Sequence, residues 1–564
     1  MNLQKDATQN ITDRLVWFTA LKDQSGITKD LSDGKEIEEI YGLGEGALFD
    51  EFFYFLSHFG IADLALKLKP KIKKRETETN FIAVFFIYIM RIVAGCRYFW
   101  NIKPVLLQSQ PLMHLVGFNA HQIREGSNQR GLHKSRKDEE ENNQEEKERQ
   151  ENKENGSIRG PVCAQFIAGF ISAILASALE IFFNKVISIL AANSFFPKRV
   201  HALLDASDIE STEACKGRGK VTKEKALELK QRQKRIRKVT ETVFGFKIWV
   251  VWDPTSKLPI AMRFTTIEVG DINMAQEVVQ QAIDNLGTHA KIVSLAFDRG
   301  FIDGKFMWWL HRDMGITFYV PAKTNMNVYT DALSCVDSGI RKQRERQRKI
   351  GAGKNSSIVT DHWDVVGIEG LTSAGFYSEK GSGSHENSKH FRPNPINAVV
   401  VINDPYKENN PDSEHMVILT NGPVNDPFVP YEGYDDRSEI ENGLFREAKQ
   451  AWFIERPSEN TKASYRAHVY LTILTMALTT VFRAWMDKQD KLESKGTETG
   501  VRKFRETVRQ ENGNKLIVFD GPRYAIFEAY EVVILCGRKV RMPRGVPETI
   551  EKKDILIKYG VLLE

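Results

Sequence analysis

The stretch between residues 200 and 323 constrains the fold most, because apolar runs follow one another there in a definite order. Residues 200–207 (VHALLDAS) form a short apolar run that ends in polar residues, as a buried strand does. Residues 271–286 have helical periodicity instead, with Asp271 as the expected N-cap. The whole stretch predicts strand, strand, strand, helix, strand, helix and strand, at residues 200–207, 243–254, 258–268, 271–286, 291–300, 303–314 and 316–323.

Three meandering strands followed by helix–strand alternation predict a mixed sheet with helices on its faces. The predicted fold class is therefore α/β, and the order of elements resembles that of the ribonuclease-H (RNase H) fold. The chain has 564 residues, which is too long for one core. We expect a mainly helical N-terminal domain (1–133), a charged linker (134–160), an RNase H-like core in two parts (161–323 and 431–488), a β-rich insertion between them (324–430) and a small C-terminal region (489–564).

The composition is that of a soluble globular protein, with 41% hydrophobic and 27% charged residues. The formal net charge is only +5, so a nucleic-acid surface would have to be built locally, by segregating charge. Five scattered cysteines without a CxxC pair argue against a zinc ribbon or a disulfide framework and fit a reducing cytosol. The N-terminal residues lack the pattern of a signal peptide, which favours a cytoplasmic protein.

Three apolar runs have to be weighed as membrane spans, which need roughly 20 apolar residues. Residues 81–90 and 468–482 are too short, and residues 164–183 contain Gln165 and Glu180. Helices buried in a large core explain these runs better, so we expect no membrane partner. A membrane protein stays an alternative that rests on residues 164–183.

Two aspartates end two of the predicted strands. Asp205 ends the apolar run of the first strand, and Asp298 ends the fourth in the same manner, before Arg299 and Gly300. An acid in such a position is costly unless it is paired or bound to a metal. These two strands are neighbours in the expected fold, so the two carboxylates could converge. The alternative is that each aspartate is a turn or cap residue at the end of its strand.

A third acid is expected on the helix after the insertion, where the candidates are Glu439, Glu441 and Glu447. Helical spacing places Glu441 on one face with Arg437 and with the apolar residues Leu444, Phe445 and Ala448. We therefore expect Glu441 to point toward the core and the sheet edge. The alternative is a surface ion pair between Arg437 and Glu441, which would contribute little.

Carboxylates gathered in this way suit phosphodiester chemistry on DNA. In that chemistry, two hard cations roughly 3.5–4 Å apart neutralise charge at phosphorus and assist the attacking and leaving oxygens. Magnesium prefers oxygen ligands. The sequence therefore predicts a site for two Mg²⁺ ions, which Mn²⁺ can replace, held by Asp205, Asp298 and Glu441.

Basic residues gather between residues 215 and 238, next to the first predicted strand. A basic loop or hairpin at this place would bind backbone phosphates without reading sequence. The alternative is a solvated amphipathic helix. A second basic run, at residues 341–349, invites the same interpretation. The DNA-contact candidates of the first segment are Lys216, Arg218, Lys234 and Arg235.

Three short motifs contain the three acids. The spacing Tyr434-x2-Arg437-x3-Glu441, followed by a lysine, resembles the Y-R-E-K signature of bacterial insertion-sequence transposases of the insertion sequence four family. The blocks LLDASDIE and FDRGFID resemble that family's blocks around the first and second acids. One departure concerns the lysine, whose family position is Ala448 here. Lys449 follows one residue later, roughly 80° further around a helix, and a long lysine can reach back.

The resemblance implies a DDE transposase that excises an insertion sequence and joins it to target DNA. Its steps would be a hydrolysis that frees a 3′-hydroxyl, a hairpin intermediate and a final strand transfer. The partners would be double-stranded DNA, at the transposon ends and the target, and a second copy of the chain. Tyr434, Arg437 and Lys449 would contact DNA, and an aromatic of the insertion would stack on a flipped base. Trp363 is the candidate by location, with a core tryptophan as the alternative.

Two other functions stay open at the level of sequence. A nuclease or resolvase can use the same fold, because a fold does not determine a function. An inactive DNA-binding relic of a transposase would keep the three motifs, and the displaced lysine supports it. For each of the three functions we expect a cytoplasmic, nucleoid-associated protein.

Overall fold

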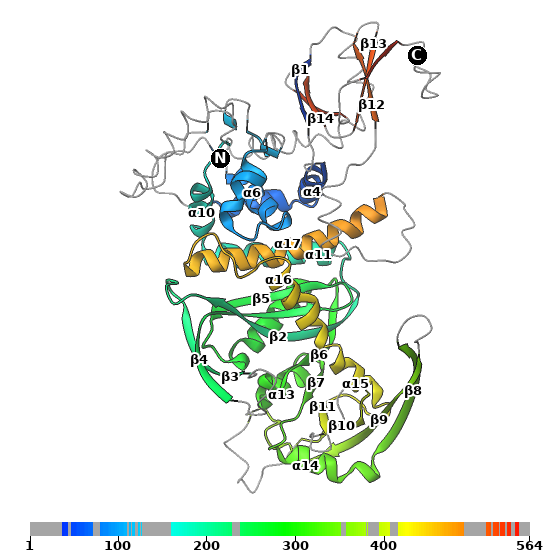
Figure 1. The fold of residues 1–564 in the computed structure, drawn as a ribbon. Coiled ribbons are helices and arrows are strands. Elements are labelled where there is room, and N and C mark those ends of the chain that lie inside the picture. The colour runs from blue at the N-terminus through cyan, green and yellow to red at the C-terminus, as the bar shows by residue number, and fades with distance from the viewer. Residues whose placement is uncertain are drawn as a thin grey trace. The chain divides into compact units, whose positions relative to one another are not determined.

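The computed structural model describes residues 37–42, 47–70, 81–109, 160–227, 237–350, 357–379, 394–405 and 415–489, short pieces between 112 and 126, strands between 515 and 551, and the single residues Thr79 and Gly381. Lys234, Arg235 and the charged linker up to residue 159 lie outside this part of the chain. The chain divides into two compact units (Figure 1). The first consists of residues 1–183 and 448–564, and the second of residues 184–447.

The centre of the second unit is a ten-stranded mixed sheet. Strand β2 (Arg199–Ser211) pairs antiparallel with β4 (Arg237–Asp253) and parallel with β6 (Lys291–Phe297). Strand β5 (Leu258–Thr266) pairs antiparallel with β4, and β7 (Thr317–Pro321) pairs parallel with β6. All five strands predicted between residues 200 and 323 form, so the predicted mixed α/β architecture is confirmed.

Two helices of this region pack on the sheet. Helix α12 (Ala275–Leu286) covers β5 and β4 with its buried aliphatic face, and α13 (Gly304–Arg312) packs on β7. Asp303 caps α13, because its carboxylate accepts a 2.9 Å hydrogen bond from the Phe306 amide. The N-cap predicted at Asp271 is wrong. Asp271 begins a 3₁₀ turn (Asp271–Met274) ahead of α12, and its carboxylate pairs with the Lys247 side chain.

The β-rich insertion extends the same sheet. Strand β11 (Met416–Thr420) pairs antiparallel with β7, and β10 (Ile396–Asn403) follows next to it. Strand β9 (Ser357–Leu371) comes next, and β8 (Ile340–Ile350) forms the edge of the sheet. Helix α14 (Asn327–Ser334) packs on β9 and β10. The hydrogen-bonded ladder is therefore continuous from the core strands into the insertion.

The segment after the insertion is helical but irregular. It consists of α15 (Phe428–Asp435), a π-helical turn η9 (Ile440–Phe445) and α16 (Arg446–Gln450). In the π turn the Arg446 amide donates to the Glu441 carbonyl, one residue further back than in an α-helix. Glycine at 443 lets this turn approach β4, because a Cβ there would lie 3.3 Å from the Trp252 ring. Such π turns are frequent at functional sites.

Aromatic and aliphatic side chains form the helical core of the first unit. Its longest helix, α17 (Lys462–Gln489), packs on three others of this unit. The Phe53 and Phe86 rings stack at 4.2 Å, and the Phe52 and Phe482 rings meet edge to face at 5.3 Å. The other helices are α4 (Ala47–His58), α5 (Ile61–Ala65), η2 (Leu66–Leu68), α6 (Phe81–Val93), η3 (Phe99–Asn101), η4 (Lys103–Leu107), α10 (Ala164–Ser172) and α11 (Ala176–Ala192), which runs into the second unit.

Two small sheets belong to the first unit. Strand β1 (Ile37–Gly42) pairs antiparallel with β14 (Glu531–Leu535), which also pairs with β15 (Arg538–Met542). The other sheet contains β12 (Lys515–Asp520), β13 (Arg523–Glu528) and β16 (Glu548–Glu551). Strand β1 lies in the N-terminal region that was expected to be mainly helical. Local sequence pattern does not reveal this strand, because its partner strand lies nearly five hundred residues later in the sequence.

Of the apolar runs weighed as membrane spans, residues 81–90 and 468–482 are almost entirely buried, whereas residues 164–183 include the exposed side chains of Leu175 and Ile181. By length and composition alone, one described helix could cross a membrane, at Lys462–Trp485, and 83% of its apolar window is buried inside the protein. Residues 164–183 are not one straight helix, since α10 and α11 meet at 86°.

Candidate active site

The pairing of β2 with β6 brings the first two acids together. The last parallel pair of these strands is Leu204 with Phe297, and the next residue on each strand is Asp205 and Asp298, respectively. The sequence had predicted that Asp205 ends its strand, and this prediction is wrong. β2 continues to Ser211, because β4 keeps pairing with it after β6 has ended. Both aspartates therefore lie at the level of the sheet where β6 ends and β2 continues beside β4.

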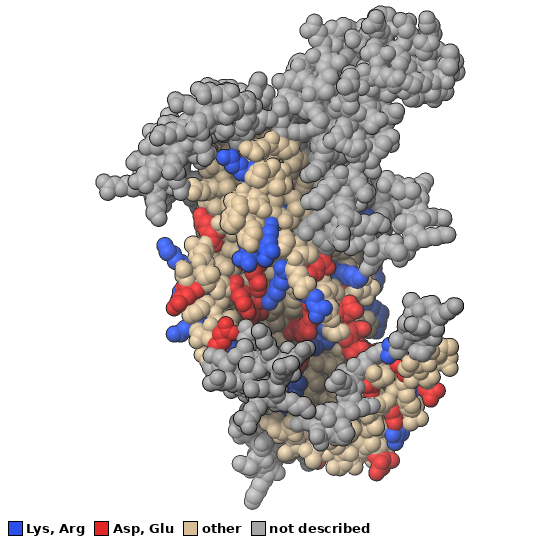
Figure 2. Space-filling model, in the orientation of Figure 1, with Lys and Arg blue, Asp and Glu red and all other residues tan. Residues whose placement is uncertain are grey.

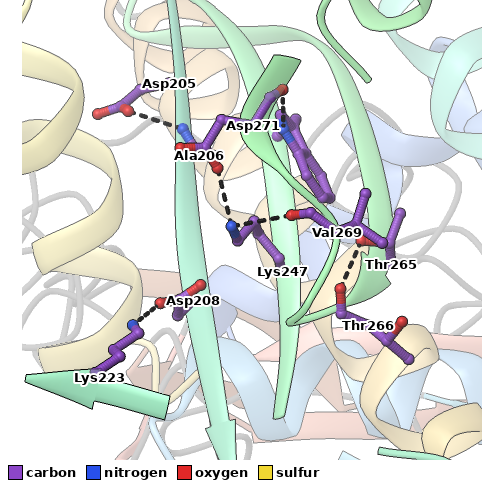
Figure 3. Close-up of polar contacts among 10 residues, drawn as sticks. Asp205, Ala206, Asp208, Lys223, Lys247, Thr265, Thr266, Val269 and Asp271 are labelled. Carbon is purple, nitrogen blue, oxygen red and sulfur yellow. Dashed lines mark hydrogen bonds and ion pairs between the residues drawn. The ribbon is translucent and has the colours of Figure 1, made fainter. Parts of the chain in front are cut away.

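Arg437 joins two of the three acids. Its Nη1 atom lies 3.2 Å from Asp205 Oδ2 and 3.2 Å from Glu441 Oε1. The other oxygen of Asp205 accepts a 2.8 Å hydrogen bond from the Ala206 amide, which Figure 3 shows beside β2. Asp205 is buried, whereas the Glu441 side chain is 56% exposed. The prediction that Glu441 points toward the core is therefore wrong, and the ion pair with Arg437 that was the alternative is present. The apolar helical neighbours Leu444, Phe445 and Ala448 are buried.

Asp298 is the third acid of this cluster. It is half-buried and close enough for its charge to act on Asp205, Tyr434 and Arg437. Burial raises the pKa of Asp205 to about 6, and the negative charges of Glu441 and Asp298 add to this effect. The Ala206 hydrogen bond and the Arg437 charge oppose it. The structure therefore gathers all three predicted acids around one guanidinium.

Tyr434 belongs to the same cluster. Burial raises the pKa of its hydroxyl, the Asp298 charge raises it further, and the Arg437 guanidinium opposes both effects. Tyr434 lies at the end of α15, and Arg437 occupies the turn between α15 and the π-helical turn. The tyrosine, the arginine and the glutamate of the sequence motif thus meet the two strand acids in space.

The cluster has the donor chemistry of a site for hard cations, since its ligands would be carboxylate oxygens. Within the described residues, no three His, Cys, Asp or Glu side chains are placed so that they could hold one metal ion together. The Arg437 guanidinium lies against two of the carboxylates. The residues fit a divalent metal by type.

Sequence reasoning missed a supporting ion pair on the neighbouring strand. Lys247 Nζ donates to Asp271 Oδ1 at 2.9 Å and to the Val269 carbonyl at 3.1 Å, as Figure 3 shows. A Cβ at Gly300 would lie 3.0 Å from the Asp271 carboxylate. Asp271 therefore lies against the turn that follows Asp298. Lys247 on β4 lies opposite Asp208 on β2. This pairing of two strands depends on tertiary structure, so the sequence alone does not reveal the position of Lys247.

The basic segment beside β2 is a β-hairpin, formed by β3 (Gly219–Leu227) and β4. Lys216 is exposed just before it. Arg218 is half-buried, donates to the Cys215 carbonyl at 3.2 Å and lies over the Phe244 ring at 4.8 Å. Arg218 thus supports the hairpin, while Lys216 presents its charge to solvent.

The remaining candidates for DNA contact have partners within the protein. Lys449 pairs with Glu455 at 3.5 Å. Trp363 is only 7% exposed on β9, so in this conformation its ring is a core side chain. The basic run at 341–349 lies on the edge strand β8, where four of its side chains pair with acids. Figure 2 likewise shows basic and acidic side chains interspersed on the visible face.

Comparison with known proteins identifies the family. A family model described as "Transposase DDE domain" matches residues 196–479, half of the chain. No curated protein matches the sequence. Among solved structures, a piggyBac transposase synaptic complex with hairpin DNA is similar at 10% sequence identity, over 83% of this chain and 79% of that chain, with a TM-score of 0.37. The matched family region contains Asp205, Asp298 and Glu441, and the chain belongs to the family of transposases with a DDE domain.

Proposed function

We propose that this chain is an active DNA transposase of the cut-and-paste type, related to the insertion sequence four family. The observation that carries the proposal is the convergence of Asp205, Asp298 and Glu441 around Arg437. The strand order β5–β4–β2–β6–β7 supports an RNase H-like core for these acids. The spacing of Tyr434, Arg437 and Glu441 supports the family assignment.

In the proposed mechanism the three carboxylates hold two Mg²⁺ ions, which Mn²⁺ can replace. Bound ions of this kind neutralise charge at phosphorus and assist the attacking and leaving oxygens. Asp205 and Asp298 provide rigid ligands, because Asp205 lies within the paired strand β2 and Asp298 directly follows the paired strand β6. Glu441 is the mobile ligand, since its side chain is 56% exposed on an irregular helix. Arg437 and Tyr434 bind the backbone phosphate next to the scissile bond.

The substrates are double-stranded DNA at the transposon ends and in the target. Hydrolysis at the transposon end frees a 3′-hydroxyl, which attacks the opposite strand to give a hairpin. The hairpin is opened, and the released 3′-hydroxyl attacks the target. Two ends have to be cut together, so a homodimer on paired ends is proposed, in the cytoplasm at the nucleoid. Lys216 contributes a contact to the phosphate backbone, because it is exposed beside the hairpin.

The test compares Asp205→Asn with the wild type on end-labelled duplexes that carry the element's terminal repeats. Cleavage should be lost while binding in a gel-shift assay stays within about twofold, because Asn keeps the shape but not the charge. Asp208→Asn is the matched control, since Asp208 lies on the same strand and pairs with Lys223. Equal losses of binding and cleavage would make Asp205 a structural residue, and retained cleavage would refute the proposal.

A nuclease or resolvase would use the same carboxylates, so strand transfer has to be measured separately. A duplex with a pre-cut 3′-hydroxyl end should be joined to plasmid DNA in the presence of Mg²⁺. Hydrolysis without joining would assign the chain to nucleases. The absence of both activities in a protein that binds the ends would identify an inactive relic.

A further inference from the structure

We infer that Arg437 is the resident counter-ion of the acidic cluster, and that it exchanges these carboxylates for a DNA phosphate when divalent metal binds. The inference rests on the proposed function and adds to it a coupling between metal binding and DNA binding. Arg437 would thus be a positioning residue before it becomes a DNA contact.

Nη1 of Arg437 makes both contacts to the acids, each at 3.2 Å. Charge-assisted N–H···O bonds are ordinarily about 2.7–2.9 Å long, and strong arginine–carboxylate pairs use two nitrogens in parallel. Arg341 and Asp364 in the same unit show the strong form. There Nε lies 2.9 and 3.1 Å from the two carboxylate oxygens, and Nη2 contacts one of them as well. Arg437 is therefore held by long, single-nitrogen contacts that are suited to exchange.

The charge balance favours the exchange. One guanidinium faces three carboxylates, so the cluster keeps an excess of negative charge when all three are ionised. A divalent ion carries twice the charge of a guanidinium, and Mg²⁺ approaches oxygen ligands to about 2.0–2.1 Å. Asp205 Oδ2 and Glu441 Oε1 are the oxygens that Arg437 contacts, and they are also the proposed metal ligands. Metal and Arg437 therefore compete for the same atoms.

Arg437 lies between two helical pieces, and besides the two carboxylates it is hydrogen-bonded to the Tyr434 side chain. The backbone at this position is a turn between α15 and the π-helical turn, not a regular helix. The Arg437 side chain is 18% exposed and that of Glu441 is 56% exposed, so a phosphate can approach from solvent. Once released, the planar guanidinium fits a backbone phosphate. Metal binding releases Arg437 for the phosphate, and phosphate binding to Arg437 frees the carboxylates for the metal. The coupling has the same size in both directions.

The first test measures Mn²⁺ binding to the full-length protein without DNA, from the electron paramagnetic resonance signal of the free ion. Arg437→Gln should bind Mn²⁺ more tightly than wild type, by on the order of tenfold, because the competing cation is gone. Arg299→Gln is the matched control, since it removes the same charge next to Asp298 without touching the other acids. An unchanged or weaker affinity in Arg437→Gln, or an equal gain in Arg299→Gln, would overturn the inference.

The second test repeats the titration with an uncleaved duplex that has one phosphorothioate at the scissile position. Wild type should bind Mn²⁺ several-fold more tightly with DNA than without it, and Arg437→Gln should lose this gain. Arg437→Lys keeps the charge and provides a second variant should Arg437→Gln fold poorly. It should bind Mn²⁺ like wild type without DNA. Equal DNA-dependent gains in wild type and Arg437→Gln would refute the exchange.

The two proposals fail in different ways. Asp205→Asn should abolish Mn²⁺ binding if the three acids are the metal site. If wild type and Asp205→Asn bind Mn²⁺ equally, the proposed active site is wrong and the exchange falls with it. If Asp205→Asn loses the metal but Arg437→Gln behaves like wild type, only the exchange is wrong.

Discussion

Two arginines, one in each unit, show how differently a charged side chain can be used. Arg91 on α6 is only 1% exposed, and its hydrogen bonds go to neutral oxygens, Tyr88 Oη at 3.0 Å and the Arg456 carbonyl at 2.5 Å. Its guanidinium also lies over the Tyr88 and Phe99 rings. Arg437 is partly exposed, and besides the Tyr434 side chain it contacts two carboxylates.

The comparison separates a structural charge from a functional one. Around Arg91 the polar groups form a chain, in which the Tyr88 hydroxyl donates to His468 Nδ1 and His468 Nε2 donates to the Phe453 carbonyl. Among the described residues Arg91 Nε finds no hydrogen-bond partner, so the network holds the guanidinium through its two Nη atoms. The Arg437 cluster has more negative than positive charge and faces solvent. An imbalance of charge at the surface is what a site for metal and phosphate requires.

The largest effect should come from removing the mobile acid of the cluster. Glu441→Gln should lower DNA cleavage about a thousandfold, equivalent to roughly 4 kcal/mol of transition-state stabilisation. Glu439→Gln should leave cleavage nearly unchanged, because Glu439 is two residues away and outside the Arg437 contacts. Initial rates of nicking on a supercoiled plasmid with both transposon ends provide the measurement. A similar loss in both variants would mean that the helix, and not one carboxylate, matters.

The second effect concerns stability and should distinguish the two arginines. Arg91→Ala should lower the free energy of unfolding by about 3 kcal/mol, because it opens a cavity and leaves buried polar groups without a partner. Arg437→Ala should change it by less than about 1 kcal/mol, as partly exposed ion pairs contribute little. Urea denaturation followed by tryptophan fluorescence measures both. Comparable losses of unfolding free energy in the two variants would mean that both arginines are structural residues.

The third effect is a pH dependence in the first unit. Burial lowers the pKa of His468 to about 3, and the Arg91 charge acts in the same direction. Its folded-state pKa lies below the unfolded value of about 6.5, so the stabilisation is present above pH 6.5 and is lost as the pH falls toward 3. Between pH 6.5 and 5 the loss should be roughly 2 kcal/mol. Thermal unfolding at both pH values should show a smaller loss for His468→Gln, and an equal loss would assign the effect to other groups.

The smallest effect should come from the turn after Asp298. Gly300→Ala places a Cβ 3.0 Å from the Asp271 carboxylate, so one of the two must shift by a few tenths of an ångström. We expect cleavage to fall several-fold, equivalent to about 1 kcal/mol, with stability unchanged. In an Asp271→Ala background Gly300→Ala should cost less activity than it does in wild type, because the carboxylate that the Cβ meets is gone. Strictly additive losses in this double-mutant cycle would show that the two residues are not coupled.

Much of the second unit could be predicted from local pattern. Apolar runs with β-branched and aromatic side chains marked all five core strands, and their order predicted the mixed sheet. The acids at 205, 298 and 441 were recognisable because a carboxylate beside an apolar run needs a partner. Three features could not be predicted: the extension of β2 to Ser211, the π turn at Glu441 and the joining of insertion and core in one sheet. Each depends on pairing or packing with residues far away in the sequence.

The sequence alone determined which side chains the site could use and the order of the elements that carry them. Carboxylate chemistry, strand propensity and motif spacing are properties of short segments. Only the tertiary structure decided that a single guanidinium lies among the acids, and that Arg91 and His468 join one buried network although 377 residues separate them. Contacts between distant segments depend on how whole elements pack, and local pattern carries no information about that packing.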